Sequence, residues 1–331
     1  MRNRLVRALR LGAGPGLCLA MLSACAYQPG PSTDTLKASD TGRLYFESVD
    51  NYDLPTNDTL IPIVVEGELT IPATFRDTTF ILSHGSGGRS RHHNRWAEFL
   101  REKGYATFIL DHFKPRRVVS TIHSQVRVTE QQMAADILSA VRLIRSHPTL
   151  GPGRIVHLGW SKGATAGIIA VMDETQRRLN ATHTVDEVIA FYPYCGFMGA
   201  VASRVPIQIL HGRLDDYTPI GVCRRLTDAM VSRGAPVVLH EFDDAHHGFD
   251  NWPIAVNFNP SAITVRDSSP RCTMIVSPGR ATQTEDGSHS VNTFAARQAF
   301  LETCAERGVH YGANPAYRKR VEAIVSESGE R

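Results

Sequence analysis

The sequence has no surplus of basic residues, no internal repeat and no closely spaced pair of cysteines. Its 331 residues include 36 Lys and Arg against 33 Asp and Glu, and four of the arginines stand within the first ten residues. Without those four, 32 basic residues face 33 acidic ones, so no nucleic-acid partner is expected. Because none of the six cysteines has Cys-x-x-Cys spacing, no metal is expected either, and nothing else calls for a cofactor.

A long apolar run is also missing. Four arginines precede an apolar stretch over 11–22, which is too short for a stable membrane span and is typical of a secretory signal peptide. The tetrapeptide LSAC that ends this stretch resembles the bacterial lipobox. This resemblance implies cleavage before Cys25 and lipidation of its sulfur and amine. A plain signal peptide with a chance cysteine is the alternative.

The chain therefore divides into three expected parts. Residues 1–24 are predicted to be a lipoprotein signal peptide, and the polar stretch 25–43, with its prolines and glycines, a flexible tether. Residues 44–331 are predicted to form a single domain. Ala26 after the lipidated cysteine resembles the signal for outer-membrane sorting. We thus expect a lipoprotein of the bacterial cell envelope that is held to the outer membrane and faces the periplasm.

Four cysteines remain beyond the leader, and an even number suits disulfides in an oxidising compartment. Cys195 closes one predicted strand and Cys223 begins the helix after the next, so adjacent strands would bring both to one edge of a sheet. We expect a Cys195–Cys223 pair, which leaves Cys272 to pair with Cys304. The second bridge would tie the long irregular segment 251–289, a candidate lid over the pocket, to the helix that follows it.

Short apolar runs alternate with helical patterns along the body of the chain. The apolar runs, which are typical of buried strands, lie at 60–72, 78–82, 105–111, 154–158, 187–195, 207–210 and 237–242. Helical patterns separate most of them, and two more, at 291–307 and 316–326, close the chain. This alternation predicts an α/β fold with a mainly parallel central sheet and helices on both faces.

A glycine-flanked serine follows one of these strands. The stretch GWSKG at 159–163 comes directly after the run at 154–158 and opens a helix, which is the setting of a nucleophile elbow. Side chains two positions before and after Ser161 would collide with the strand and the helix, so glycines are needed there. The helix start also places backbone N–H groups beside the hydroxyl. An ordinary glycine-rich turn is the alternative.

A serine hydroxyl is a weak nucleophile and needs a base and an acidic partner for that base. Asp215 and His247 each stand just past the end of a predicted strand, so both should lie at the same edge of the sheet as Ser161. Their chain order is Ser, Asp, His. Asp216 and His246 are adjacent alternatives, and the spacing of the surrounding motifs favours Asp215 and His247.

Two loops should border the same site. The loop SHGSGG at 83–88 suggests that the backbone N–H groups of Ser86 and Lys162 stabilise an oxyanion. The loop DHFKPRR at 111–117 also follows a strand, and one of its adjacent arginines could bind a substrate carboxylate. A solvated basic loop is the alternative. The tentative substrate contacts are Trp160, His112, Phe113 and Arg116.

Other histidines have less specific interpretations. His84 is expected to be structural. The pair His92 and His93 is expected at the surface start of a helix, with the pocket entrance as the alternative. No carboxylate or cysteine stands at ligand spacing to the histidine pairs, which argues against a metal site.

Taken together, GWSKG, HGRLDDYTP and AHHGF, with HGSGG upstream, resemble the dienelactone-hydrolase-like branch of the α/β-hydrolases over about 60–249. The resemblance implies the α/β-hydrolase fold, with Ser161 as nucleophile, Asp215 as acid and His247 as base. Dienelactone hydrolase proper is expected to carry cysteine at the position of Ser161. This departure favours a general ester hydrolase.

The expected function is hydrolysis of a small-molecule carboxylic ester or lactone through an acyl-enzyme, on a protein held to a membrane by its lipid. Two alternatives stay open. Relatives of the resembling family include prolyl-oligopeptidase-like peptidases, so a peptidase or amidase is the first. The second is a non-catalytic envelope-binding lipoprotein with the same fold, and the complete Ser–His–Asp set argues against it.

Overall fold

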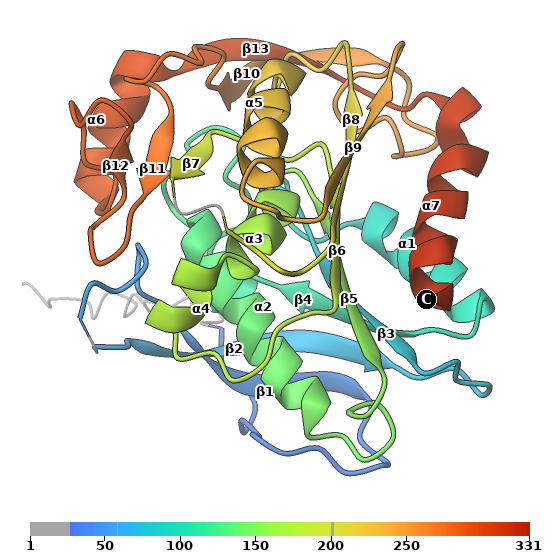
Figure 1. Cartoon of the computed structure of the whole chain (residues 1–331). Helices are drawn as coiled ribbons and strands as arrows, with labels where there is room; N and C mark the ends of the chain where they lie inside the picture. The colour runs from blue at the N-terminus through green and yellow to red at the C-terminus, as the bar shows by residue number, and fades with distance from the viewer. Residues whose placement is uncertain (1–26, 58, 200–201) are drawn as a thin grey trace, which may run out of the picture.

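The structure is a computed structural model that describes residues 27–331 except 58 and 200–201. The predicted signal peptide and the lipidation site Cys25 lie outside the described residues. An eight-stranded sheet runs through the molecule (Figure 1). Its order is β1 (Gly42–Val49), β2 (Pro62–Thr70), β4 (Ala106–Asp111), β3 (Thr78–Ser83), β5 (Arg154–Trp160), β6 (Glu187–Phe191), β8 (Ile207–Gly212) and β9 (Val237–Phe242).

The sheet is mainly parallel, as predicted. β1 and β2 pair antiparallel to each other, and β2 pairs antiparallel to β4. All strands from β4 to β9 along the sheet are parallel. The carboxyl ends of these parallel strands therefore meet at one edge, where ligands of such sheets bind.

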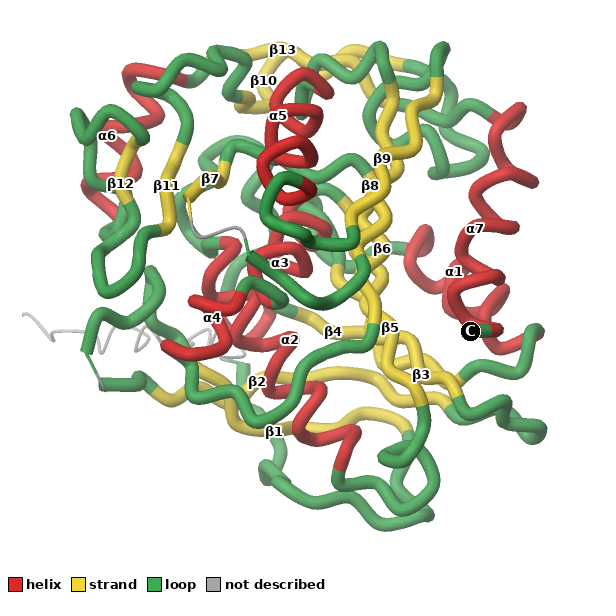
Figure 2. The backbone as a smooth tube through the Cα atoms, in the orientation of Figure 1, coloured by secondary structure: helices red, strands yellow, loops and turns green. Residues whose placement is uncertain are grey.

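Helices cover both faces of the sheet (Figure 2). The core on one face includes side chains of α2 (Glu130–Arg145), α3 (Lys162–Ala170) and α5 (Ile220–Val231). The core on the other face includes side chains of α1 (Arg91–Glu102) and α7 (Arg318–Glu330). The short α4 (Asp173–Arg178) follows α3. The fold is thus the three-layer α/β arrangement that the alternating pattern predicts.

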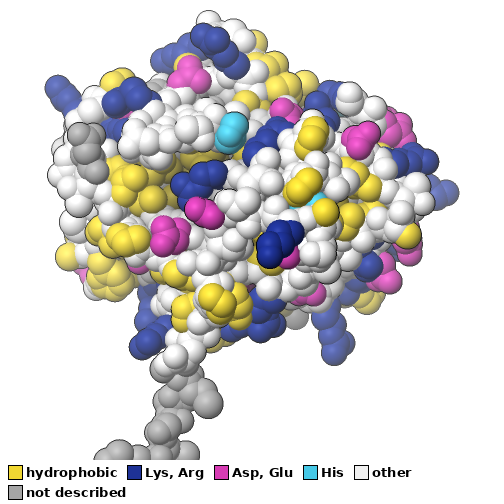
Figure 3. Space-filling model, turned by 90° about the horizontal axis from the view of Figure 1, so that it is seen from below, with side chains coloured by type: hydrophobic (Ala, Val, Ile, Leu, Met, Phe, Trp, Pro, Cys, Tyr) yellow, Lys and Arg dark blue, Asp and Glu magenta, His cyan; other side chains and the backbone are white. Residues whose placement is uncertain are grey.

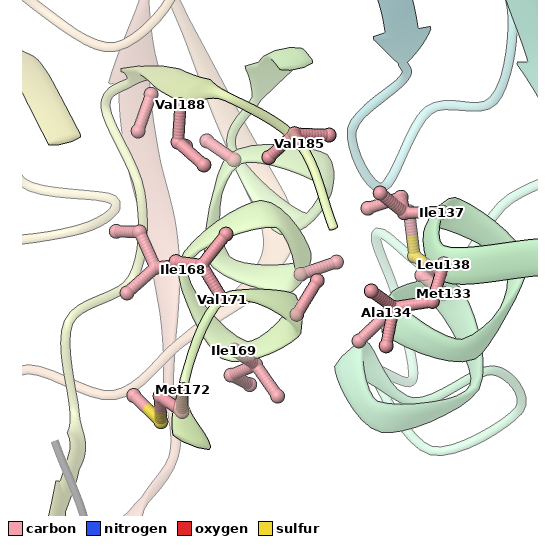
Figure 4. Close-up of a cluster of buried hydrophobic side chains, with 14 of the residues drawn as sticks. Met133, Ala134, Ile137, Leu138, Ile168, Ile169, Val171, Met172, Val185 and Val188 are labelled. Atoms are coloured by element: carbon pink, nitrogen blue, oxygen red, sulfur yellow. The ribbon is translucent and has the colours of Figure 1, made fainter. Parts of the chain in front are cut away.

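Burial on both faces explains why the strands read as continuous apolar runs. In β3, Ile81 belongs to the core beneath α2 and α3, while Phe80 and Leu82 belong to the core beneath α1 and α7. Alternate residues of a strand point to opposite faces, so both sets must be apolar. Figure 4 shows the first core where α2 and α3 meet, with Met133 on α2 and Ile169 on α3.

The chain joins the folded body earlier than predicted. β1 begins at Gly42, inside the expected tether 25–43, and the side chain of Leu36 is buried. The backbone N–H of Thr33 donates to the carbonyl oxygen of Tyr45 at 2.8 Å. The prediction of a flexible tether is therefore wrong for this part, because an apolar side chain and backbone hydrogen bonds hold it against the sheet.

The segment 251–289 is also more ordered than predicted. It contains three short strands, and two small sheets form from strands that are distant in the sequence. β10 (Asn257–Thr264) pairs with β13 (Glu306–Tyr311), and β11 (Met274–Val276) lies between β7 (Phe197–Gly199) and β12 (Gln283–Thr284). The helix predicted at 291–307 is α6 (Phe294–Cys304). Residues 306–307, which were expected at the end of this helix, begin β13 instead.

The structure contains both predicted disulfides, Cys195–Cys223 and Cys272–Cys304. The second one joins the loop before β11 to the end of α6. Among the helices in the described part of the chain, none has the length and apolar character needed to cross a membrane.

Candidate active site

Ser161 occupies the turn between β5 and α3 with φ 51° and ψ −117°. A positive φ is strained for any residue other than glycine. A Cβ added to Gly159 would lie 2.6 Å from the carbonyl oxygen of Gly163, and one added to Gly163 would clash with the carbonyl oxygens of Ser83 and His84. The turn therefore requires both glycines, for the steric reason that the sequence suggests.

A chain of hydrogen bonds leads from Ser161 to two residues in the loops that follow other strands. The Oγ of Ser161 lies 3.0 Å from Nε2 of His247, and Nδ1 of His247 lies 2.8 Å from Oδ2 of Asp215. A proton on Nδ1, donated to the carboxylate, leaves Nε2 free to accept from the serine hydroxyl. The three residues follow β5, β8 and β9, whose carboxyl ends lie at one edge of the sheet.

The Asp215 carboxylate is buried and well supplied with donors. Its Oδ1 accepts from the backbone N–H groups of Tyr217 and Thr218 at 2.9 and 2.8 Å. Burial alone would raise the pKa of Asp215, but the charge and hydrogen bond of His247 and the Thr218 N–H bring it below its usual value. An ionised carboxylate is therefore in place to orient the imidazole and stabilise its protonated form.

The two adjacent alternatives are engaged elsewhere. Asp216 accepts hydrogen bonds from the backbone N–H and the Nδ1 of His310, each at 2.8 Å. Nδ1 of His246 lies 3.0 Å from the carbonyl oxygen of Leu214. The structure thus brings Asp215 and His247 to Ser161, and not their neighbours.

The loop after β3 passes directly beside the serine. A Cβ added to Gly85 would lie 3.1 Å from Cβ of Ser161, and Ser86 and Lys162 line the same cavity as Ser161. Lys162 is the first residue of α3, where backbone N–H groups have no acceptor within the helix. The loop and the helix start can therefore present N–H groups to a substrate oxygen next to Ser161.

A cavity opens at this point, with about 560 Å³ of empty space when its open, solvent-filled part is included. The polar part of its lining includes Ser86, Gln125, Glu130, Ser161, Lys162, Tyr217, Thr218 and Arg297. The apolar part includes Ile263, Val265, Met274, Phe300 and Leu301. These apolar side chains come from β10, the residue after it, β11 and α6, so the segment predicted as a lid supplies part of the cavity wall.

The four tentative substrate contacts do not line this cavity in the described structure. Trp160, His112 and Phe113 are buried, and so is the guanidinium of Arg116. His112 and Arg116 both bind the Asp136 carboxylate of α2, at 2.8 Å each. The structure does not support the predicted substrate-contact role: Asp136 engages His112 and Arg116 in the interior, and the indole N–H of Trp160, at the end of β5, donates to Asp250.

A charged group at the cavity was not predicted. The Nζ of Lys162 lies 3.0 Å from Oε1 of Glu130, and the guanidinium of Arg297 binds the other oxygen. Burial alone would raise the pKa of Glu130, but the two cations lower it to about 2. Glu130 opens α2 and Arg297 lies on α6, so their contact depends on a tertiary arrangement that the sequence motifs do not contain.

The histidines of the loop after β3 and of the first turn of α1 are part of the interior. His84 is fully buried with Nδ1 2.9 Å from the carbonyl oxygen of Gly85, and burial beside His112 lowers its pKa to about 4. His93 accepts from the backbone N–H of Ser90 at the start of α1. His92 and His93 are both buried, so the prediction of a surface position is wrong. Across the described residues, no group of three His, Cys, Asp or Glu side chains could hold a metal ion.

A strained serine between a parallel strand and a helix, with an imidazole and a carboxylate at the same sheet edge, defines the α/β-hydrolase class. The strand order and the helices on both faces belong to the same class. The sequence model of the dienelactone hydrolase family matches residues 66–264, more than half of the chain. The chain belongs to this family, and it is a hydrolase by that membership.

Solved structures of similar fold include esterase 2 of the planctomycete Thermogutta terrifontis. The butyrate-bound form has a TM-score of 0.45 and 21% identity, over 62% of this chain and 86% of that chain. The form phosphorylated by paraoxon has a TM-score of 0.47 and 23% identity, over the same shares of the two chains. No curated protein sequence matches the chain.

Proposed function

We propose that the protein is a serine hydrolase that cleaves carboxylic esters or lactones through an acyl-enzyme. The observation that carries this proposal is the hydrogen-bonded series Ser161–His247–Asp215, with steps of 3.0 and 2.8 Å, at the mouth of a cavity. Family membership supports hydrolysis, and the presence of serine supports ester chemistry by a hydroxyl nucleophile.

In the proposed reaction, Oγ of Ser161 attacks the carbonyl carbon while Nε2 of His247 takes the hydroxyl proton. Asp215 holds the imidazole and stabilises the imidazolium. The backbone N–H groups of Ser86 and Lys162 donate to the developing oxyanion. His247 then protonates the leaving alkoxide. A water molecule, deprotonated by the same imidazole, attacks the acyl-enzyme and releases the carboxylic acid and Ser161.

The cavity supports a compact substrate with distinct polar and apolar ends. Apolar side chains of β11 and α6, including Met274 and Phe300, favour a hydrocarbon group of the substrate. Gln125 and Tyr217 also line the cavity, with the Gln125 amide 3.3 Å from the Tyr217 hydroxyl, and favour contact with a substrate oxygen. The proposed mechanism uses side chains, backbone N–H groups and water.

Labelling with a fluorophosphonate tests the nucleophile. The wild-type protein is expected to be labelled at Ser161, and Ser161→Ala to lose both the label and p-nitrophenyl ester hydrolysis, by at least about 10³-fold in kcat. Ser232→Ala, at an exposed serine after α5, should keep both. A wild type that is neither labelled nor active on esters, lactones or aminoacyl amides would indicate the non-catalytic alternative. Activity on amides alone would indicate a peptidase.

We also propose that a lipid on Cys25 holds the protein to the bacterial cell envelope, with the body facing the periplasm. The lipobox-like sequence of the leader supports this localisation. The two disulfides support it independently, because such bonds persist in oxidising compartments.

A further inference from the structure

A buried carboxylate lies close to residues of the candidate triad and does not belong to the described lining of the cavity. Asp250 is fully buried and accepts hydrogen bonds from the Nε1 groups of Trp96 and Trp160, at 2.9 and 2.7 Å, and from the hydroxyl of Tyr192 at 2.6 Å. The Nε2 of His92 lies 3.1 Å from the same carboxylate. Four side chains from three separate elements thus converge on one carboxylate.

The surroundings favour the ionised form of this carboxylate. Burial alone would raise the pKa of Asp250, but the charge of the nearby His92 and the hydrogen bonds of Tyr192 and Trp160 hold it below its usual value. A buried carboxylate is costly unless donors satisfy both of its oxygens. An apolar residue of similar volume could fill the same space without the cost of burying a charge. Packing alone therefore does not explain why a carboxylate with several donors stands here.

Two of the donors connect directly to the reacting groups. Trp160 is the residue before Ser161, and the ring of Tyr192 lies 4.5 Å from the ring of His247. The carbonyl oxygen of Tyr192 also accepts from the hydroxyl of Thr218, which itself contacts the acid and the base of the triad. Tyr192 therefore lies next to the imidazole through its ring, and its backbone is linked to the imidazole through Thr218.

The backbone at these two connections is strained. Ser161 has φ 51° and Tyr192 has φ 40°, both in the left-handed region that side chains disfavour. Such conformations cost free energy and persist only where the surrounding structure enforces them. Asp250 is connected to both positions, because it accepts one hydrogen bond from Trp160, the neighbour of Ser161, and one from the hydroxyl of Tyr192 itself.

We propose that Asp250 is a positioning residue for the hydrolytic reaction: through Trp160 and Tyr192, its carboxylate fixes the nucleophile turn and one face of the His247 imidazole. This inference rests on the proposed function of Ser161 as nucleophile. Among the described residues, Asp250, Trp160 and Tyr192 are not part of the cavity lining, so the inference concerns the rate of the chemical step and not substrate binding.

The test compares Asp250→Asn with wild type in ester hydrolysis and in fluorophosphonate labelling. The amide keeps the volume but replaces one carboxylate oxygen with an NH₂ group, which cannot accept from the donors on that side. We expect kcat and the labelling rate to fall about 10- to 100-fold, as for a small displacement of reacting groups, while KM changes less than about threefold. Asp286→Asn, at an exposed carboxylate that accepts from Ser288 and Thr284, should change none of these values.

Tyr192→Phe is the second variant, because it removes one hydroxyl and keeps the ring. Its kcat should fall about 3- to 30-fold at constant KM, even if Asp250→Asn fails to fold. The proposal is overturned if both variants lose thermal stability but keep the wild-type kcat, because the carboxylate is then purely structural. If Asp250→Asn does not fold, the same result in Tyr192→Phe alone decides against the proposal. Absence of wild-type labelling at Ser161 would instead reject the proposed function, and this inference with it.

Discussion

At the floor of the cavity, Glu130 lies between the cations of Lys162 and Arg297. Its pKa is lowered from the usual 4.5 to about 2 in the folded protein. A carboxylate whose folded pKa is depressed contributes stability above its unfolded pKa, and that contribution is lost as the pH falls through the folded value. This part of the stability is therefore present at pH 7 and disappears between about pH 4.5 and pH 2.

Replacing Glu130 with Gln should strongly destabilise the protein at neutral pH. Two buried cations then lack a counter-charge, which costs about 3–5 kcal/mol in comparable buried pairs. Urea unfolding at pH 7 and at pH 3 measures the effect, and the difference between variant and wild type should be smaller at pH 3. Glu302→Gln, on the exposed face of α6, serves as control. An equal loss for Glu130→Gln at both pH values would contradict the assigned charge state.

Sequence motifs locate residues whose function depends on local structure. Ser161 stands in a glycine-framed turn, and Asp215 and His247 follow strands, so each could be found from its own neighbourhood. Glu130 and Arg297 are 167 positions apart, and no local pattern links them. One available signal was overlooked: Asp136 stands between apolar positions on the buried side of a helix, and a carboxylate there implies a cationic partner such as Arg116.

At the scale of elements, the parallel strands were the most predictable part of the fold. β9 has the predicted bounds, and β3, β5 and β8 extend one or two residues beyond them. Strands buried on both faces need apolar residues throughout, which makes them easy to recognise. The small sheets were missed because strands such as β12, with two residues, are too short to show a period.

The helix α6 joins the cavity to the second disulfide. Arg297, Phe300 and Leu301 line the cavity, and Cys304 lies one turn further along the same side of the helix. Cys304 is bonded to Cys272, two residues before the cavity-lining Met274. The disulfide therefore ties together two of the elements that form the apolar part of the lining, β11 and α6.

Phe300→Ala should change which esters the enzyme prefers. Removing a buried phenyl ring from the wall enlarges the cavity beside Ser161, so longer acyl chains gain contact area of about 0.8 kcal/mol per CH₂ group. We expect the ratio of kcat/KM for p-nitrophenyl hexanoate to that for the acetate to rise about tenfold or more. Unfolding stability should fall by about 3–5 kcal/mol, so the assays are made on folded protein at low temperature.

Phe294→Ala is the matched control for this wall. Phe294 stands at the start of the same helix with half of its surface exposed, and it does not belong to the described cavity lining. Its loss should leave the hexanoate-to-acetate ratio unchanged. An unchanged ratio in Phe300→Ala as well would mean that the acyl group lies elsewhere in the site.

On the scale of the whole molecule, the position of the first described residues bears on the proposed lipid anchor. The Tyr27 hydroxyl donates to Glu66 on β2 at 2.9 Å, and Leu36 is buried. Two peptide units separate Cys25 from Tyr27, which span at most about 7 Å when extended. Basic and acidic side chains are interspersed on the face that looks downward in Figure 1 (Figure 3). A lipid on Cys25 would therefore hold the body close to the membrane, and the face seen in Figure 3 carries charges of both signs.

Because the covalent lipid is then the main attachment, losing one sulfur atom should release the whole protein. Cys25→Ser is expected to move the protein from the membrane fraction to the soluble fraction and to abolish metabolic labelling with palmitate, while the disulfides and ester hydrolysis stay intact. Cys18→Ser, at the other leader cysteine, should leave the protein in the membrane fraction, because that position precedes the expected cleavage site. A Cys25→Ser protein that resists extraction at high salt would show that the body itself binds the bilayer, and the lipid anchor would then be the wrong explanation.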